Sequence, residues 1–305
     1  MDSPCLLGRS SFACVCRRIA VALAVAAWLG IVNVLPAAEP DRLIDQLWNQ
    51  GVVFDQTQAI PLPRPTLADG LDPAAQQQAL ARVADETHPL EALTRKSVVA
   101  PFVLKISDEK PLGGALPRRV DLWFVAYGDL KVIADESFLK GQIDAGSKGD
   151  QGGFLSDQDL QSRNITPEKD QRFLAGAVTL FDRVRISGVM RTQLTRSDES
   201  ATVAAVLDPR FDKDARFPNG WQPATRDDNG KVQFGETHLY HSAAWYCKAT
   251  KLVQPAGAVL VEYHLLFDEP HAWFNGANLL RSKLPILVQD GVRKFRRRLE
   301  GQGSQ

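Results

Sequence analysis

Cysteine is scarce in this sequence and unevenly placed. Cys5, Cys14 and Cys16 lie within the first 38 residues, and Cys247 is the only cysteine that follows them. With one cysteine after that point, the remainder of the chain cannot form an internal disulfide, which excludes a small disulfide-stapled scaffold. A chain of 305 residues is long enough to be stabilised by a hydrophobic core instead.

An excess of charge of either sign is also missing. The chain has 36 lysines and arginines and 36 aspartates and glutamates. Removing the first 38 residues removes Arg9, Arg17, Arg18 and Asp2, which changes the net charge to about −2. A nearly neutral chain has no overall field that would attract nucleic acid. We therefore expect no nucleic-acid partner.

The motifs of familiar catalytic and metal sites are absent as well. The sequence has no phosphate-binding glycine loop, no Gly-x-Ser-x-Gly and no His-Glu-x-x-His, and beyond residue 38 it has no pair of cysteines. His238 and His241 lie three residues apart in a predicted strand, so they should point to opposite faces of the sheet. We expect no metal ion and no cofactor.

The first 38 residues have the character of an export signal. Three arginines precede an apolar run from Ile19 to Leu35, and the small residues Ala37 and Ala38 follow it. This order is typical of a secretory signal peptide, so we expect an exported protein of the bacterial cell envelope, in the periplasm or outside the cell. Pro36 weakens the cleavage site, so a membrane tether through residues 19–35 stays open as an alternative.

The order of predicted elements indicates an α+β chain. Residues 39–96 favour short helices and extended stretches, and Asp72-Pro73 should begin a helix because Asp72 can cap free amides. Residues 97–300 favour antiparallel strands followed by a helix. Alternating apolar residues predict strands at 98–106, 120–127, 181–194, 201–207, 239–250 and 258–268. Residues 120–127 are apolar on both faces except at Asp121, which indicates burial on both sides.

Two further segments complete the predicted domain. Apolar residues recur at steps of three and four through residues 284–299, the spacing of an amphipathic helix that starts or kinks at Pro285. Residues 141–170 are poor in large apolar side chains. We expect them to be a flexible insertion with one short helix capped by Ser156.

The C-terminal third of the chain resembles a known superfamily. Residues 258–273, Ala-Val-Leu-Val-Glu-Tyr-His-Leu-Leu-Phe-Asp-Glu-Pro-His-Ala-Trp, followed by Asn278 and the helix through Leu299, are similar to the ending of the START and polyketide-cyclase-like helix-grip domains. The resemblance implies a curved antiparallel sheet packed on a long C-terminal helix, with an apolar cavity for a lipid or another hydrophobic small molecule. It makes Tyr263, Trp273, Leu284 and Val288 the candidate ligand-binding residues.

A few side chains are candidates for catalysis. Glu262 and His264 share one face of a strand, where a buried pair could carry out acid–base chemistry. Cys247 could act as a nucleophile beside a histidine, but its place on an apolar strand face favours a buried, inert thiol.

The basic run at residues 293–298 fits a solvated helix face opposing the negative end of the helix dipole, or a site for anionic headgroups.

These observations lead to one leading hypothesis and two alternatives. The leading hypothesis is an exported, non-enzymatic helix-grip-like module that binds a hydrophobic small molecule or lipid. The first alternative is an envelope enzyme with a pocket around Glu262 and His264, or around Cys247. The second is a structural or assembly protein of the envelope whose segment 141–170 and basic helix end bind partners.

Overall fold

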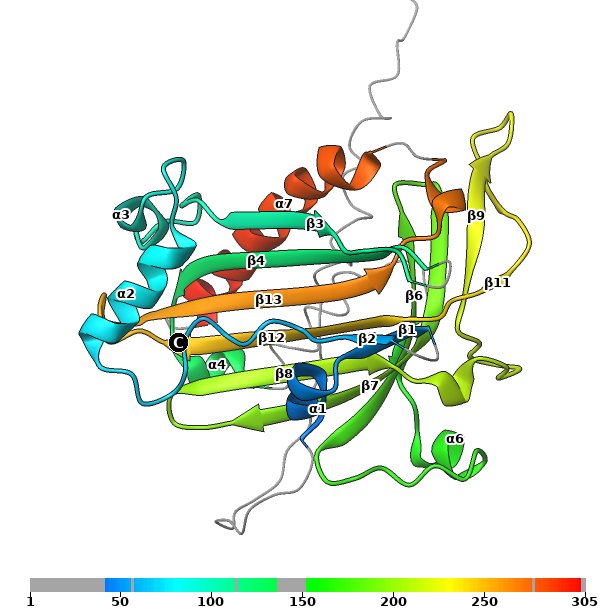
Figure 1. Cartoon of the computed structure of the whole chain (residues 1–305), viewed down its shortest axis with the longest axis horizontal. Coiled ribbons are helices and arrows are strands. Elements are labelled where there is room, and N and C mark those ends of the chain that lie inside the picture. Colours follow the sequence, from blue (N-terminus) through cyan, green and yellow to red (C-terminus); the bar gives the residue numbers. More distant parts are fainter. Residues whose placement is uncertain (1–41, 56–57, 113–114, 136–151, 276–277, 303–305) are drawn as a thin grey trace, which may run out of the picture.

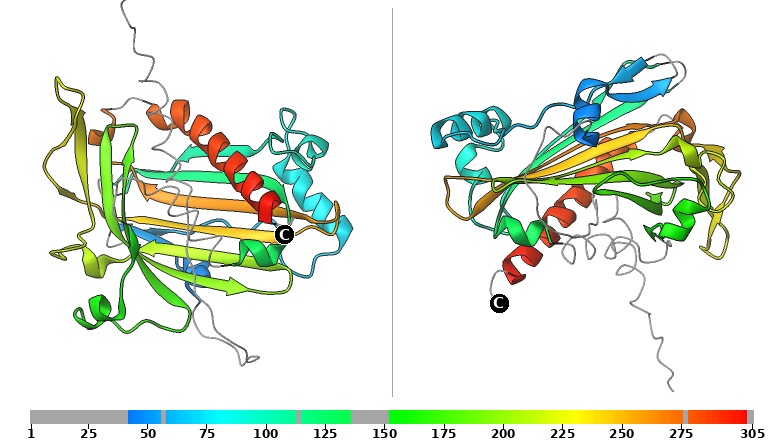
Figure 2. Two further views of the ribbon diagram at one scale, coloured as in Figure 1. Left: turned by 180° about the vertical axis from the view of Figure 1, so that it is seen from behind. Right: turned by 90° about the horizontal axis from the view of Figure 1, so that it is seen from below.

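A large antiparallel sheet lies between one long C-terminal helix and a layer of N-terminal elements (Figures 1 and 2). The computed structural model describes residues 42–55, 58–112, 115–135, 152–275 and 278–302. The prediction of an α+β fold with a curved antiparallel sheet, a long C-terminal helix and N-terminal helices is confirmed. The predicted leader lies outside the described residues. Within them, no helix is both long enough and apolar enough to cross a membrane.

The strands of the main sheet follow each other in space in the order β10-β9-β7-β8-β12-β13-β4-β3, with β6 paired to β5 and β7, and β11 paired to β9. Every pairing in the described part of this sheet is antiparallel. The strands are β3 (Val103–Asp108), β4 (Pro117–Tyr127), β5 (Gly153–Phe154), β6 (Gln171–Leu180), β7 (Val184–Arg196), β8 (Ser200–Leu207), β9 (Gly220–Arg226), β10 (Val232–Phe234), β11 (His238–Leu239), β12 (Ala243–Lys251) and β13 (Ala258–Asp268).

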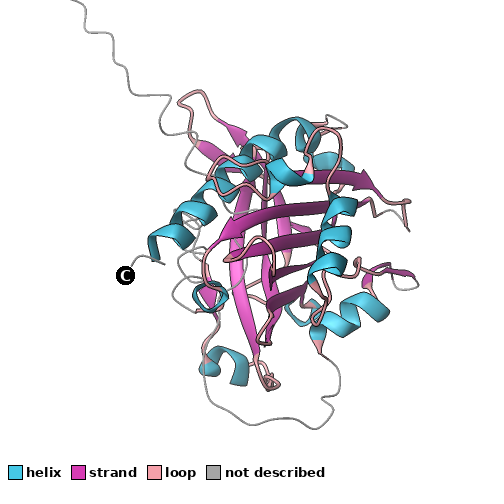
Figure 3. Ribbon diagram, turned by 90° about the vertical axis from the view of Figure 1, so that its left-hand side faces the viewer, coloured by secondary structure: helices cyan, strands magenta, loops and turns pink. Residues whose placement is uncertain are grey.

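The sheet changes direction along β7. The first residues of β7 pair with β9, whereas its residues from Met190 onward pair with β8. Gly188 lies between these two stretches, where a Cβ atom would come within 2.7 Å of Leu207 Cδ1 and 2.9 Å of Asn219 Oδ1. A larger residue at this position would force these side chains to shift. In Figure 1, β6 and β9 consequently run across the direction of β4, β13 and β12, and Figure 3 shows the two directions from the side.

The inner face of the sheet packs against helix α7 (Leu279–Gln302). Alternate residues of β4 and β13 point to this face, among them Leu122, Phe124 and Val261. The rings of Phe295 on α7 and Phe124 on β4 meet edge-on, with 5.3 Å between their centroids. The helix begins six residues before Pro285, so that proline lies inside it and leaves one backbone position without a donor. Helix α4 (Leu130–Ile133) lies on the same face.

The outer face of the sheet is covered by the N-terminal segment. This layer contains α1 (Leu43–Asn49), the hairpin β1 (Val52–Asp55) and β2 (Gln58–Ile60), α2 (Pro73–Val83) and α3 (Leu90–Leu93). As predicted, Asp72 caps α2, and its Oδ1 accepts a hydrogen bond of 2.8 Å from the Ala75 amide. The extended residues 61–72, here called the strap, run along the outer face between β2 and α2.

Some boundaries differ from the prediction. Residues 98–102 are not a strand. The backbone carbonyls of Val98, Ala100 and Pro101 accept hydrogen bonds from the Arg296 side chain of α7 and not from a neighbouring strand. Strands β6 and β9 were not predicted. In the predicted insertion, residues 152–170 hold β5 and helix α6 (Asp157–Gln161), which begins with the predicted Ser156 cap. Residues 141–151 lie outside the described residues.

Candidate ligand cavity and a buried polar cluster

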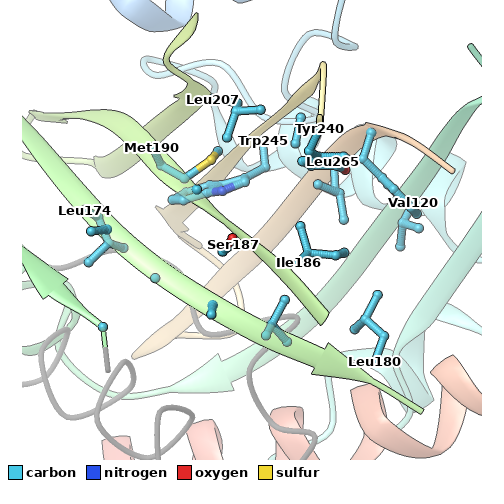
Figure 4. A pocket seen from close by; sticks show the side chains of 18 of the residues that line it. Val120, Leu174, Leu180, Ile186, Ser187, Met190, Leu207, Tyr240, Trp245 and Leu265 are labelled. Carbon is cyan, nitrogen blue, oxygen red and sulfur yellow. The ribbon is translucent and has the colours of Figure 1, made fainter. Parts of the chain in front are cut away.

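An apolar cavity of about 250 Å³ lies between the curved sheet and the first half of α7 (Figure 4). Its described walls come mainly from β6, β7, β12, β13 and α7. They include Met190, Leu207, Trp245 and Leu265, which Figure 4 labels around the cavity. Among the described lining residues, no side chain carries a formal charge. A concave, uncharged, mostly hydrophobic site of this kind is suited to an apolar molecule.

Hydroxyl groups account for most of the polar character of the walls. The Ser187 hydroxyl donates weakly to the backbone carbonyls of Pro218 and Gly220, at 3.3 and 3.4 Å. The Tyr240 hydroxyl donates to the Asp268 carbonyl at 3.2 Å. Tyr263 stacks on Trp245, with 5.8 Å between the ring centroids. Burial raises the pKa of Tyr263 well above its ordinary value, so its hydroxyl stays protonated.

The structure places the four candidate ligand-binding residues at different depths. Tyr263 and Leu284 line the cavity. Trp273 does not belong to the lining, but its ring lies 5.6 Å from Tyr240 and 6.3 Å from Phe267, both of which do. Val288 is fully buried in the core beneath α7 and is not among the lining residues.

Cys247 lies on the inner face of β12, beside Tyr263 of β13. Burial raises the pKa of its thiol to about 12, so the reactive thiolate is scarce at neutral pH. The alternation of strand residues directs His264 to the opposite face of the sheet. Of the two histidines that lie near Cys247 in the sequence, His238 stacks on Trp221, with 4.4 Å between the ring centroids, and His241 is exposed before β12 begins. Cys247 and His264 therefore do not form a nucleophile–base pair.

Glu262 and His264 meet on the outer face, under the strap, where they form a buried cluster with Asp121. His264 Nδ1 lies 2.6 Å from Asp121 Oδ1, and His264 Nε2 lies 3.3 Å from Glu262 Oε2. Glu262 and His264 are 0% and 1% exposed. Burial lowers the pKa of His264, but hydrogen bonds and charges from Asp121 and Glu262 outweigh this effect and raise it overall. These acid–base groups are separated from the cavity by the sheet itself.

Side chains rising from the sheet hold the strap over this cluster. The Thr66 amide donates to Glu262 Oε2 at 2.8 Å, and Trp123 Nε1 donates to the Thr66 hydroxyl at 2.9 Å. The Tyr246 hydroxyl donates to the Pro63 carbonyl at 2.9 Å. Lys248 Nζ donates to the Leu67 carbonyl at 2.8 Å and to Asp69 Oδ1 at 2.9 Å. Buried polar groups of β4, β12 and β13 thus act as attachment points for an extended chain.

The basic run near the end of α7 contains one residue that is not solvated. Arg296 is 2% exposed and donates to the Val125 carbonyl at 2.8 Å. It also donates to the carbonyls of Val98, Ala100 and Pro101, at 3.2, 2.5 and 3.1 Å. Burial lowers its pKa to about 10. The expectation of a solvated face is therefore wrong for Arg296, because it satisfies the carbonyls of a loop that forms no strand.

Sequence reasoning missed most of the cavity wall. Leu174, Ile186 and Met190 come from β6 and β7, and no pattern in the sequence indicated that these strands would fold over α7. Asp121 was recognised as the polar exception in an apolar strand, but it was not predicted to join Glu262 and His264. Among the described residues, no group of three or more His, Cys, Asp or Glu side chains is placed to hold a metal ion.

Comparisons with known proteins were made by sequence and by structure. No protein-family model and no curated protein sequence matches the chain. Similar solved structures include the lipid transfer and protein localization domain of human StarD13 (DLC2), with 6% identity over 64% of this chain and 89% of that one, and a TM-score of 0.34. Human STARD10 has 6% identity over 75% and 84% of the two chains and a TM-score of 0.31.

A third similar structure is CalU16 from Micromonospora echinospora. It has 5% identity over 67% of this chain and 96% of that one, with a TM-score of 0.25. The architecture of the chain itself confirms the helix-grip-like fold that the resemblance of residues 258–299 implies. It is a continuous antiparallel sheet with a long C-terminal helix across its inner face.

Proposed function

We propose that this protein binds a hydrophobic small molecule or lipid in the cavity beneath α7. The observation that supports this function is the cavity itself, about 250 Å³ with uncharged, mainly apolar described walls. Folded proteins usually pack their interiors densely and leave few voids larger than a water molecule. An apolar cavity of about 150 Å³ is already large enough to hold benzene. The space here is therefore large enough for a ligand of greater size.

The proposed module is non-enzymatic. The acid–base groups Glu262 and His264 lie on the other side of the sheet from the cavity and from Cys247. The hydroxyls on the described cavity walls belong to serine and tyrosine side chains, with no histidine or carboxylate among the lining residues to activate them. A bound molecule would be held in this cavity and not chemically changed by it.

We further propose that the protein is exported and that it acts in the bacterial cell envelope. The order of arginines, apolar run and small residues in the first 38 positions supports this location. Expression of the full chain in a bacterial host, followed by cell fractionation and N-terminal sequencing, tests it. A processed N-terminus near Ala38 in the periplasmic fraction is the expected result, and an unprocessed cytoplasmic chain would contradict it.

A cavity-filling variant tests the binding function. Gly176 lies in β6 on the cavity wall, and a Cβ atom placed on it meets no heavy atom within 4 Å. Gly176→Phe should therefore fill the cavity at little cost to the fold. Gly153→Phe is a matched control, because Gly153 also has open space around a Cβ atom but lies exposed on β5, outside the lining.

The measurement is solvent extraction and mass spectrometry of gently purified protein. The wild type and Gly153→Phe should release a hydrophobic compound, and Gly176→Phe should release at least about tenfold less of it, since the aromatic ring occupies the same space. Equal amounts from the wild type and from both variants would show that the compound is held elsewhere and would reject the proposal.

A further inference from the structure

Two residues that line the apolar cavity carry hydrogen-bond donors that have no partner among the described residues. They are Tyr263, with its hydroxyl, and Trp245, with its indole N–H, and their rings are stacked with 24° between their planes. The side chains are well buried, with Tyr263 only 4% and Trp245 7% exposed. Buried polar groups in folded proteins are almost always hydrogen-bonded. An unmet donor on a cavity wall therefore indicates an acceptor that arrives with the ligand.

The rest of the described wall restricts what that ligand can be. The hydroxyls of Ser187 and Tyr240 already donate to backbone carbonyls. No lysine, arginine or histidine is among the described lining residues, so a carboxylate or phosphate placed inside would have no opposite charge. Burying an unpaired charge is far more costly than burying a neutral acceptor.

Tyrosine also suits a neutral acceptor better than a charged one in this position. Because burial raises the pKa of Tyr263 well above its ordinary value, the hydroxyl remains a donor throughout the neutral range. Trp245 can only donate through its indole nitrogen. The aromatic pair can thus supply two donors to a cavity whose remaining described walls favour hydrocarbon.

We infer that the cavity selects uncharged molecules that combine an apolar body with a hydrogen-bond acceptor, such as a ketone, ester or ether oxygen, and that Tyr263 binds this acceptor. The inference rests on the proposed function, because it concerns the same cavity. It goes further by excluding free carboxylic acids as preferred ligands and by assigning the specificity to one hydroxyl group.

Three probes of similar size distinguish the ligand classes. Butylbenzene has no acceptor, butyrophenone is its ketone, and phenylbutyrate carries a carboxylate. Their dissociation constants are measured by isothermal titration calorimetry at neutral pH with the wild type and with Tyr263→Phe. Tyr127→Phe serves as a matched control, because that tyrosine lies on β4 outside the cavity lining and donates to the Thr94 carbonyl.

We expect butyrophenone to bind the wild type at least as tightly as butylbenzene, and phenylbutyrate to bind at least about a hundredfold more weakly than butyrophenone. In Tyr263→Phe the dissociation constant of butyrophenone, divided by that of butylbenzene, should rise about tenfold. The reason is that the ketone oxygen is then buried without the tyrosine hydroxyl as a donor. Butylbenzene should bind this variant as it binds the wild type, which shows that the variant is folded. The control variant should leave the ratio unchanged.

Two failures have different meanings. An unchanged ratio in Tyr263→Phe, or phenylbutyrate binding as tight as that of butyrophenone, would overturn the inference and leave the proposed hydrophobic binding in place. If none of the three probes binds the folded wild type, the proposed function fails together with the inference.

Discussion

His264 of β13 and Asp121 of β4 are cross-strand partners whose side chains meet beneath the strap, with 2.6 Å between Nδ1 and Oδ1. Glu262 completes the cluster on the other side of the imidazole. The Tyr246 ring packs over the His264 ring, with 4.7 Å between the ring centroids. A histidine held between two carboxylates is stabilised in its protonated form, and here this effect outweighs the cost of burial. We therefore expect the stability of the fold to depend on the protonation of His264.

The first prediction concerns the pH dependence of stability. Because the folded-state pKa of His264 is raised above 6.5, its stabilising contribution is fully present below pH 6.5 and is lost as pH rises through the folded-state pKa. The free energy of unfolding should therefore fall across this window. In His264→Gln this part of the pH dependence should disappear. Urea denaturation at a series of pH values measures it.

The control for this prediction is His271→Gln, since His271 is an exposed histidine in a short 3-10 helix, outside the cluster. It should keep the wild-type pH profile. A profile that is unchanged in His264→Gln would mean that the imidazole does not gain a proton-dependent stabilisation in the folded protein.

Only part of this cluster could be predicted from the sequence. The alternation of residues placed Glu262 and His264 on one face, and Asp121 was recognised as the polar exception in an apolar strand. That β13 lies next to β4, with His264 opposite Asp121, depends on long-range pairing that alternation does not specify. The covering strap could not be predicted either, because its contacts join residues far apart in the chain, such as Thr66 and Glu262.

The cavity illustrates a different limit. Strand β6 contains the small residues Ala175, Gly176 and Ala177, and small residues weaken the pattern by which a strand is recognised. All three line the cavity, where their small size leaves space. The small residues that make the strand hard to predict from the sequence therefore also leave room for the cavity in the structure. The strands with large apolar residues, β4, β12 and β13, were predicted with only small errors in their bounds.

The second prediction concerns Arg296, whose guanidinium group donates to the carbonyls of Val125, Val98, Ala100 and Pro101. Arg296→Leu should lower the free energy of unfolding by about 3 kcal/mol, because these buried acceptors lose their donor. Arg296→Lys should recover only part of the loss, since an ammonium group cannot reproduce the planar fork of donors. Chemical denaturation measures both changes.

Arg297→Leu is the matched control, because Arg297 is the exposed neighbour on the same helix. Its effect should stay within about 0.5 kcal/mol. Similar losses in Arg296→Leu and Arg297→Leu would show that the charge of the basic run matters and that the buried hydrogen bonds do not.

The third prediction concerns the attachment of the strap through Lys248. Its ammonium group is buried and bonds both the Leu67 carbonyl and Asp69. Lys248→Met should lower the free energy of unfolding by about 2 kcal/mol, because the Leu67 carbonyl and Asp69 lose this donor. The loss is limited because Asp69 is partly exposed and can bond water instead. It should also speed proteolysis within residues 61–72, which peptide mapping by mass spectrometry detects.

Lys251→Met provides the comparison on the same strand, since Lys251 is exposed at the end of β12. It should leave the cleavage rate of the strap unchanged. If Lys248→Met loses stability without faster cleavage there, Lys248 stabilises the sheet but does not hold the strap.

The fourth prediction separates two residues of α7 that the sequence placed together as ligand contacts. Leu284 lines the cavity, whereas Val288 is fully buried and does not. Leu284→Ala should lower the free energy of unfolding by about 3 kcal/mol and extend the cavity by the volume of the lost side chain. The ratio of the hexylbenzene affinity to the butylbenzene affinity should then be higher than in the wild type.

Val288→Ala should also lower the free energy of unfolding, by about 2 kcal/mol, but it should leave this affinity ratio unchanged, because any space it creates lies outside the cavity wall. Calorimetric titration of both hydrocarbons measures this affinity ratio. An equal change of the ratio in Leu284→Ala and Val288→Ala would show that the ligand reaches Val288, deeper beneath the helix than the cavity wall.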